Sequence, residues 1–164
     1  GPPGSGHCRF WRRRQRLKKA AAMPMEEALI ARLNGAATIN TITGDGVPGP
    51  AGRQAISWFD RQRGDPLPGI TLSKISPGRE YDHSGPDRLD RPRVQIDCYA
   101  RTSAAAAALH RAVRAEMEAG ADVAGIRFHP AQLDGEGWTF DGEEDGGEPL
   151  YRASQDFLFY FEEL

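Results

Sequence analysis

Apolar residues recur at helical spacing in two segments of the chain, Met25–Asn34 and Thr102–Ala119. The first segment carries acidic side chains in its first turn, where they suit the positive end of the helix dipole, and both segments stop before a glycine. Thr102 or Ser103 can cap the longer helix, and we expect His110 to lie on its solvent-facing surface. The apolar stripe of this helix comprises Ala105, Leu109, Val113 and Met117, with Ala108 and Ala112 beside it.

Alternation of apolar and polar residues predicts strands in other segments. The clearest is Arg91–Ala100, which has one apolar and one polar face, and Val123–Pro130 alternates in the same way. Leu150–Glu163 closes the chain as a long strand that is apolar on both faces, so we expect it to be central in a sheet or to form an interface. Shorter strands are expected at Ala55–Asp60 and Gly69–Ser76, and Trp138–Asp141 can extend a hairpin.

The order of these elements is helix, strands, helix and strands, without a repeated βαβ unit. That order predicts an α+β fold with a mainly antiparallel sheet, a long helix packed on it and a short N-terminal helix. We expect one crossover connection at the long helix. The apolar stripe of that helix should pack against Val94 and Ile96 or against the Phe157–Phe161 segment. Cys98 should be a buried and inert thiol.

The 164 residues suit a single domain, but their charge is distributed unevenly. Residues 1–19 hold seven of the 21 basic residues and no acidic residue, whereas residues 20–164 hold 14 basic and 23 acidic residues. We expect residues 1–22 to be a basic, disordered extension that folding does not need, and residues 23–164 to be one domain. The alternative is that the basic extension, with its two aromatic side chains, is an arm that binds nucleic acid.

The segment Asp134–Glu148 contains seven acidic residues and neither Lys nor Arg. Its spacing lacks the alternating Asp or Asn residues of a calcium loop. We expect these carboxylates to repel one another, so that the segment is a solvated loop or an acidic surface that faces a partner.

The sequence predicts no catalytic, cofactor-binding or metal-binding residues. Its four histidines are well separated, and none has a Cys, Asp or Glu at a metal-ligand spacing. Phosphate loops and nucleophile elbows are absent from the sequence. The apolar runs are too short to span a membrane, and two cysteines without a disulfide framework suit a reducing compartment. A small hydrolase is the rival class, and it requires His83, His129 and a carboxylate to converge in one pocket.

Three segments together resemble one known family. They are Pro66–Ala100, which contains PxITLxxIS and then GPDxLxRPRVQIDCYA, the alanine-rich helix after it, and the ending LYRASQDFLFYFEE. From about Met25 to Leu164, the sequence resembles the tail completion, or tail terminator, proteins of long-tailed bacteriophages and of phage-derived gene transfer agents.

The resemblance implies a structural subunit that is not an enzyme and uses no cofactor. Such subunits assemble as a ring, typically a hexamer, which ends the tail tube and offers a surface to the head connector. We therefore expect the chain at the head-proximal end of the tail of a virion or gene transfer agent particle, assembled in the bacterial cytoplasm. The implied partners are a second copy, the tail tube protein, the head–tail connector or stopper, and DNA that passes through the lumen without specific binding. No membrane partner is expected, and a head–tail stopper or connector subunit is the nearest alternative.

The candidate oligomer or partner surface combines large apolar or aromatic side chains of the predicted strands with acidic side chains of the acidic segment. We expect the acidic segment to face the lumen or its rim, where it would repel the phosphates of passing DNA. The candidate residues are Trp58, Phe59, Asp141, Glu143, Glu144, Asp145, Leu158 and Tyr160.

Overall fold

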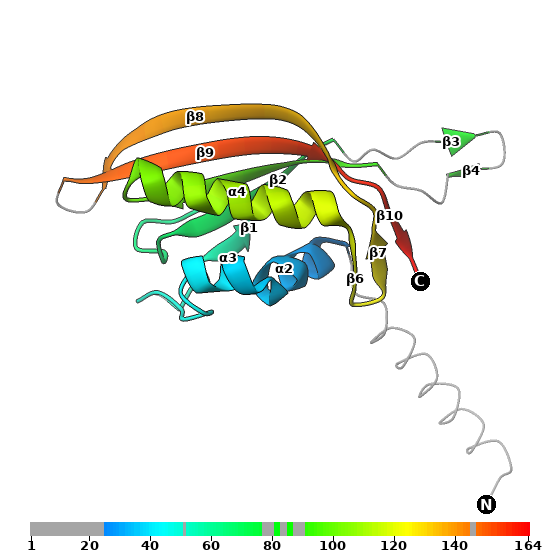
Figure 1. Cartoon of the computed structure of the whole chain (residues 1–164), viewed down its shortest axis with the longest axis horizontal. Coiled ribbons are helices and arrows are strands. Elements are labelled where there is room, and N and C mark those ends of the chain that lie inside the picture. The colour runs from blue at the N-terminus through cyan, green and yellow to red at the C-terminus, as the bar shows by residue number, and fades with distance from the viewer. Residues whose placement is uncertain (1–24, 51, 77–80, 83–84, 87–90, 145–146) are drawn as a thin grey trace, which may run out of the picture.

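A five-stranded sheet in the order β1-β2-β5-β9-β8 forms the centre of the protein (Figure 1). The computed structural model describes residues 25–50, 52–76, 81–82, 85–86, 91–144 and 147–164. The strands of the central sheet are β1 (Ile56–Trp58), β2 (Gly69–Ser76), β5 (Arg93–Ala100), β8 (Gln132–Glu144) and β9 (Glu148–Leu158).

The described residues also form two smaller sheets and three helices, and these helices lie on one face of the central sheet (Figure 1). Apart from the parallel pair β1 and β2, neighbouring strands of the described sheets are antiparallel. This arrangement confirms the predicted α+β fold. The remaining elements are α2 (Met25–Gly35), α3 (Ala37–Ile42), β3 (Tyr81–Asp82), β4 (Gly85–Pro86), α4 (Ser103–Ala119), β6 (Ala121–Val123), β7 (Ile126–Phe128) and β10 (Phe161–Glu163).

The long helix α4 packs across β5 and β9. The side-chain oxygen of Thr102 accepts a hydrogen bond from the backbone N–H of Ala105 at 3.1 Å, so Thr102 caps the helix. His110 was expected on the solvent-facing surface of this helix, but its side chain is buried. Ala108 was expected beside the apolar stripe, but it is exposed. The buried residues of α4 are Ala106, Leu109, His110, Val113 and Met117.

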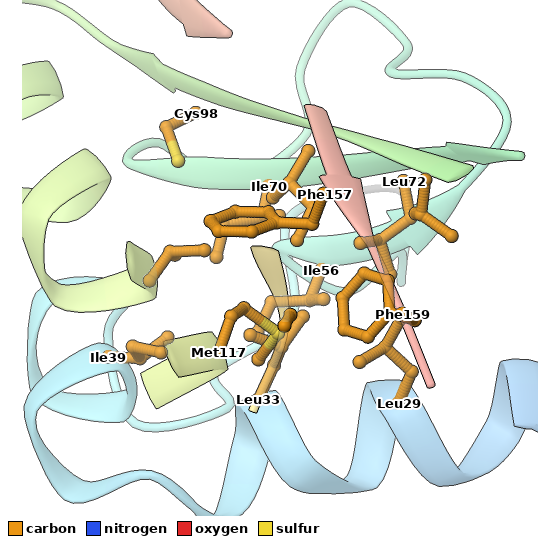
Figure 2. Close-up of a cluster of buried hydrophobic side chains, with 14 of the residues drawn as sticks. Leu29, Leu33, Ile39, Ile56, Ile70, Leu72, Cys98, Met117, Phe157 and Phe159 are labelled. Carbon is orange, nitrogen blue, oxygen red and sulfur yellow. The ribbon is translucent and has the colours of Figure 1, made fainter. Parts of the chain in front are cut away.

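The helices and the sheet enclose one hydrophobic core. Figure 2 shows Leu29 and Leu33 of α2 pointing toward Met117 of α4 and toward Phe159. Cys98 is fully buried in this core, as predicted, and burial raises the pKa of its thiol. The predicted packing of α4 on the strands is confirmed, since one buried cluster contains Val94, Ile96, Leu109, Val113, Met117, Phe157 and Phe159.

The connection that contains α4 is the predicted crossover. Both β5 and β8 are antiparallel to β9, which lies between them, so β5 and β8 run parallel to each other. The chain leaves β5, passes through α4, β6 and β7, and returns as β8. Because of this route, β8 is the outermost strand, and the following strand β9 lies between β5 and β8.

The expected single C-terminal strand is broken at Phe159 and Tyr160, between β9 and β10. The backbone N–H of Phe159 donates to the carbonyl of Pro92 at 2.9 Å, and the N–H of His129 donates to the carbonyl of Tyr160 at 2.8 Å. β9 then pairs with β5 and β8, whereas β10 pairs with β7 in the three-stranded sheet. The segment is apolar on both faces because it passes from one sheet to the next.

The expected strand Val123–Pro130 is also divided, because a two-residue turn separates β6 from β7. Ala124 and Gly125 have φ values of 52° and 80°, the left-handed conformation that tight hairpin turns require. The alternation of apolar and polar residues continues across this turn, so the sequence pattern does not show where β6 ends and β7 begins. The sequence pattern also missed α3, a short helix that follows α2 directly and buries Ile39.

Candidate assembly surface

The acidic segment is largely a strand, so the solvated-loop interpretation is wrong and the predicted hairpin at Trp138–Asp141 is confirmed. Most of it belongs to β8, which pairs with β9 and forms one edge of the central sheet (Figure 1). The pairing is irregular between Leu133 and Gly135 and between Phe140 and Glu143. Bulges of this kind are typical of edge strands and leave the strand between them regular.

The expected repulsion among these carboxylates is wrong, because partners from other parts of the chain lie beside them. Basic side chains come from β5, β9, α4, the segment after β1 and the segment between β5 and α4. The pairs are Arg93–Asp134 at 3.1 Å, His110–Glu136 at 2.8 Å, Arg152–Asp141 at 3.5 Å, Arg61–Glu144 at 2.8 Å and Arg101–Glu148 at 3.1 Å. Five of the seven carboxylates of the acidic segment therefore have a basic partner within the same chain.

The pair Arg61–Glu144 is largely enclosed, with side chains that are only 10% and 11% exposed. The two terminal nitrogens of Arg61 donate to the two carboxylate oxygens of Glu144 at 2.8 and 2.9 Å. The same guanidinium lies 5.7 Å from the ring centre of Tyr99 on β5. The hydrogen bond from Arg61 lowers the pKa of Glu144, and the charges of Arg61 and Arg101 act in the same direction. This pair therefore fastens the end of β8 to the body of the protein.

Arg61→Gln is expected to lower the free energy of unfolding by about 1–3 kcal/mol at neutral pH, because it removes a two-pronged charged hydrogen bond. The pKa of Glu144 is depressed in the folded protein, so this stabilisation is present above the ordinary value of 4.5. It is lost as the pH falls through the folded-state pKa. Urea denaturation of both proteins should therefore show a difference that shrinks as the pH falls from neutrality to about 3.

The matched control is Arg114→Gln, because the Arg114–Glu118 pair lies on the exposed surface of α4. Its effect should stay below about 0.5 kcal/mol across the same pH range. A difference for Arg61→Gln that does not change with pH would show that the charge of Glu144 is not what the contact stabilises.

Two of the candidate residues lie at the β1 edge of the sheet. The indole N–H of Trp58 donates to the backbone carbonyl of Glu26 at 2.9 Å, so half-buried Trp58 connects β1 to α2. The next residue, Phe59, is 79% exposed and has a φ of 76°. The ring of Phe59 is therefore free to contact a partner, whereas Trp58 stabilises the contact between β1 and α2.

The other candidates lie on the far side of the sheet or at its end. Asp141 and Glu143 are exposed residues of β8, and Asp145 lies outside the described residues. Leu158 and Tyr160 are half-buried where β9 ends. The structure thus places the candidates at both edges of the sheet and at the end of the inner strand β9, and it does not bring them into one patch.

Two aromatic residues of β8, Trp138 and Phe140, are part of this surface but were not candidates in the sequence. Each is 55% exposed. The sequence does contain a signal for them, because Glu136, Trp138 and Phe140 alternate with small residues in the manner of a strand. The density of acidic residues obscured that signal.

The described residues contain no group of three or more His, Cys, Asp or Glu that could hold a metal ion. His83, which the hydrolase alternative requires, lies outside the described residues. His129 lies 3.5 Å from Glu162, and both side chains are almost half exposed, so this pair is a surface contact.

The sequence model of a family described as Tail completion protein gp17 matches residues 27–162. The chain belongs to the tail completion protein gp17 family. Among solved structures, a chain of the "Virion of native gene transfer agent (GTA) particle" is 15% identical, with a TM-score of 0.50. That match covers 85% of this chain and 93% of the other, and it shows a shared fold. No curated protein matches the sequence.

Family membership confirms the resemblance that the sequence showed, and it makes this tail completion protein a structural component of phage-type tails. The family match runs from α2 to β10, so it includes both edges of the central sheet. None of the helices in the described part of the chain is long and apolar enough to cross a membrane.

Proposed function

We propose that this tail completion protein forms a ring that ends the tail tube and joins it to the head connector. The family match over residues 27–162 carries the proposal, because it spans nearly all of the described fold. By its resemblance to the family, the ring is expected to be a hexamer. The tail tube protein and the head–tail connector or stopper are the proposed partners on its two sides.

The charge of the body suits a channel through which DNA passes without specific binding. Residues 20–164 hold 23 acidic and 14 basic residues. Several arginines of the sheet region are already engaged by carboxylates, as in Arg61–Glu144, Arg93–Asp156 and Arg152–Asp141. Specific or tight DNA binding requires clustered cations that neutralise phosphates, and such paired arginines contribute little to it.

We propose the head-proximal end of the tail, in a virion or gene transfer agent particle, as the location of the ring. The structure with the shared fold is titled as the virion of a gene transfer agent particle, which supports a place in such a particle. The subunit would reach it by assembly in the bacterial cytoplasm.

Deletion of the gene in a particle-producing host tests the proposed function. We expect heads that remain unjoined and tails of irregular length, and expression of the full chain should restore joined particles. Unjoined tails of normal length would favour a head–tail stopper instead. Normal particles in the deletion strain would contradict a role in tail completion.

A further inference from the structure

Large apolar side chains that remain exposed gather at the two edges of the central sheet. β1 and β8 are its outermost strands in the described part of the chain. Phe59 follows β1, Ile75 lies on the neighbouring β2, and Trp138 and Phe140 lie on β8. The other exposed large apolar side chains of the described residues are Val47 and Leu164.

The β8 edge combines a long strand with two aromatic rings. The Trp138 ring centre lies 4.8 Å from that of His110, and the Phe140 ring centre lies 5.2 Å from that of Tyr151. Each ring thus has a neighbour within the subunit, yet about half of its surface stays exposed. Between the two irregular positions of β8, residues 135–140 contain neither Lys nor Pro, and their one charged side chain, Glu136, contacts His110 within the subunit. Edges of this kind favour pairing with another chain.

The β1 edge carries an exposed aromatic residue at the centre of a strained γ-turn that ends the strand. Phe59 has a φ of 76°, in the left-handed region that favours glycine. Its backbone N–H donates to the carbonyl of Leu72 at 2.8 Å, and the N–H of Asp60 donates to the carbonyl of Trp58 at 3.0 Å. These bonds hold the strained residue in place, while its ring gains little burial. Strain at an exposed aromatic residue indicates a functional position.

We propose that the β8 edge of one copy contacts the β1 edge of the next, with Trp138 and Phe140 packed against the surface around Phe59. This inference rests on the ring proposed above. The occupant is a second copy because two unlike apolar surfaces lie at opposite edges of the same sheet. Contacts between unlike surfaces of identical chains run head to tail, and they close into a ring when the rotation fits. Central aromatic residues commonly carry most of the binding energy of such an interface.

Two variants test this inference, and each removes the aromatic rings from one edge of the sheet. Phe59→Gly replaces the strained residue with one that tolerates a positive φ, so it should keep or raise the melting temperature. Trp138→Thr combined with Phe140→Thr removes both rings and retains strand-favouring side chains. Each variant alone should require at least about a tenfold higher concentration than the wild type to assemble, measured by native mass spectrometry. Leu164→Thr, at an exposed apolar position outside both edges, is the control and should assemble normally.

An equimolar mixture of the two variants distinguishes a head-to-tail contact from a symmetric one. Each variant keeps the edge that the other has lost, so the mixture should form a dimer with twice the 18.0 kDa mass of one chain. A mixture that stays monomeric while the wild type forms rings would overturn the inference.

Cross-linking in particles gives a readout that does not require assembly in solution. In a Cys8→Ser background, Phe59→Cys combined with Trp138→Cys should join neighbouring copies through a short bismaleimide, and either single cysteine should not. Cys98 is buried and therefore should not react.

The possible results distinguish a failure of the proposed edge contact from a failure of the proposed ring. Normal rings from both edge variants, or efficient cross-linking through one cysteine alone, would overturn the edge contact and leave the ring intact. A wild-type chain that is monomeric in solution, with no cross-link between copies in particles, would overturn the ring as well.

Discussion

Leu109→Ala is expected to lower the free energy of unfolding by about 2–5 kcal/mol. Leu109 is fully buried where α4 packs across β5 and β9. Both strands are hydrogen-bonded on each side, so the sheet cannot easily collapse into the cavity that the truncation leaves. Urea denaturation followed by circular dichroism measures the difference.

Arg111→Ala is the control for this substitution, because Arg111 is exposed on the same helix. It should change the free energy of unfolding by no more than about 0.5 kcal/mol. A loss for Leu109→Ala that is no larger than that of the control would mean that α4 does not bury this face.

Glu116→Gln is expected to cost roughly 3 kcal/mol, because it leaves a buried cation without its counter-charge. The side chain of Arg32 on α2 is only 1% exposed, and its guanidinium lies 5.3 Å from the ring centre of Phe128. Its Nε donates to the carboxylate of Glu116 at 3.2 Å, and Nη2 donates to the backbone carbonyl of Glu116. Burial lowers the pKa of Arg32, and the carboxylate of Glu116 opposes that shift. Thermal and urea denaturation measure the loss.

Glu118→Gln provides the comparison, since Glu118 pairs with Arg114 on the exposed side of the same helix. That substitution should cost less than about 0.5 kcal/mol. If the two substitutions have equal effects, the contact between α2 and α4 does not depend on the charge of Glu116.

The elements at the centre of the sheet could be predicted because burial there follows a local period. The predicted strand Gly69–Ser76 coincides with β2, and β5 lies within the predicted Arg91–Ala100. The helix over 102–119 was recognisable because its apolar residues recur at the spacing of one buried face. Each of these patterns lies within a single element, so no knowledge of the rest of the chain is needed.

Contacts between distant segments could not be predicted in this way. The acidic segment contains no cation of its own, and the residues that pair with it, such as Arg61 and Arg93, lie far away in the sequence. His110 was expected on the surface because histidine is polar, yet its ring nitrogen lies 2.8 Å from a carboxylate oxygen of Glu136. Partners of this kind follow from strand order, which local patterns do not specify.

The candidate surface was only partly predictable. Phe59 was recognised as a large aromatic residue of a short strand, but its positive φ and its exposure are visible only in the structure. The hairpin at Trp138–Asp141 was predicted, but the exposure of Trp138 and Phe140 is visible only in the structure. That they share an edge strand depends on the pairing of β8 with β9.

Cryo-electron microscopy of purified particles tests the central claim most directly, because it shows where the chain lies and how its copies meet. We predict a closed cyclic ring of this chain at the head-proximal end of the tail, between the tube and the connector. Particles in which the chain is missing from that position, or is present only as copies that do not contact one another, would contradict the claim.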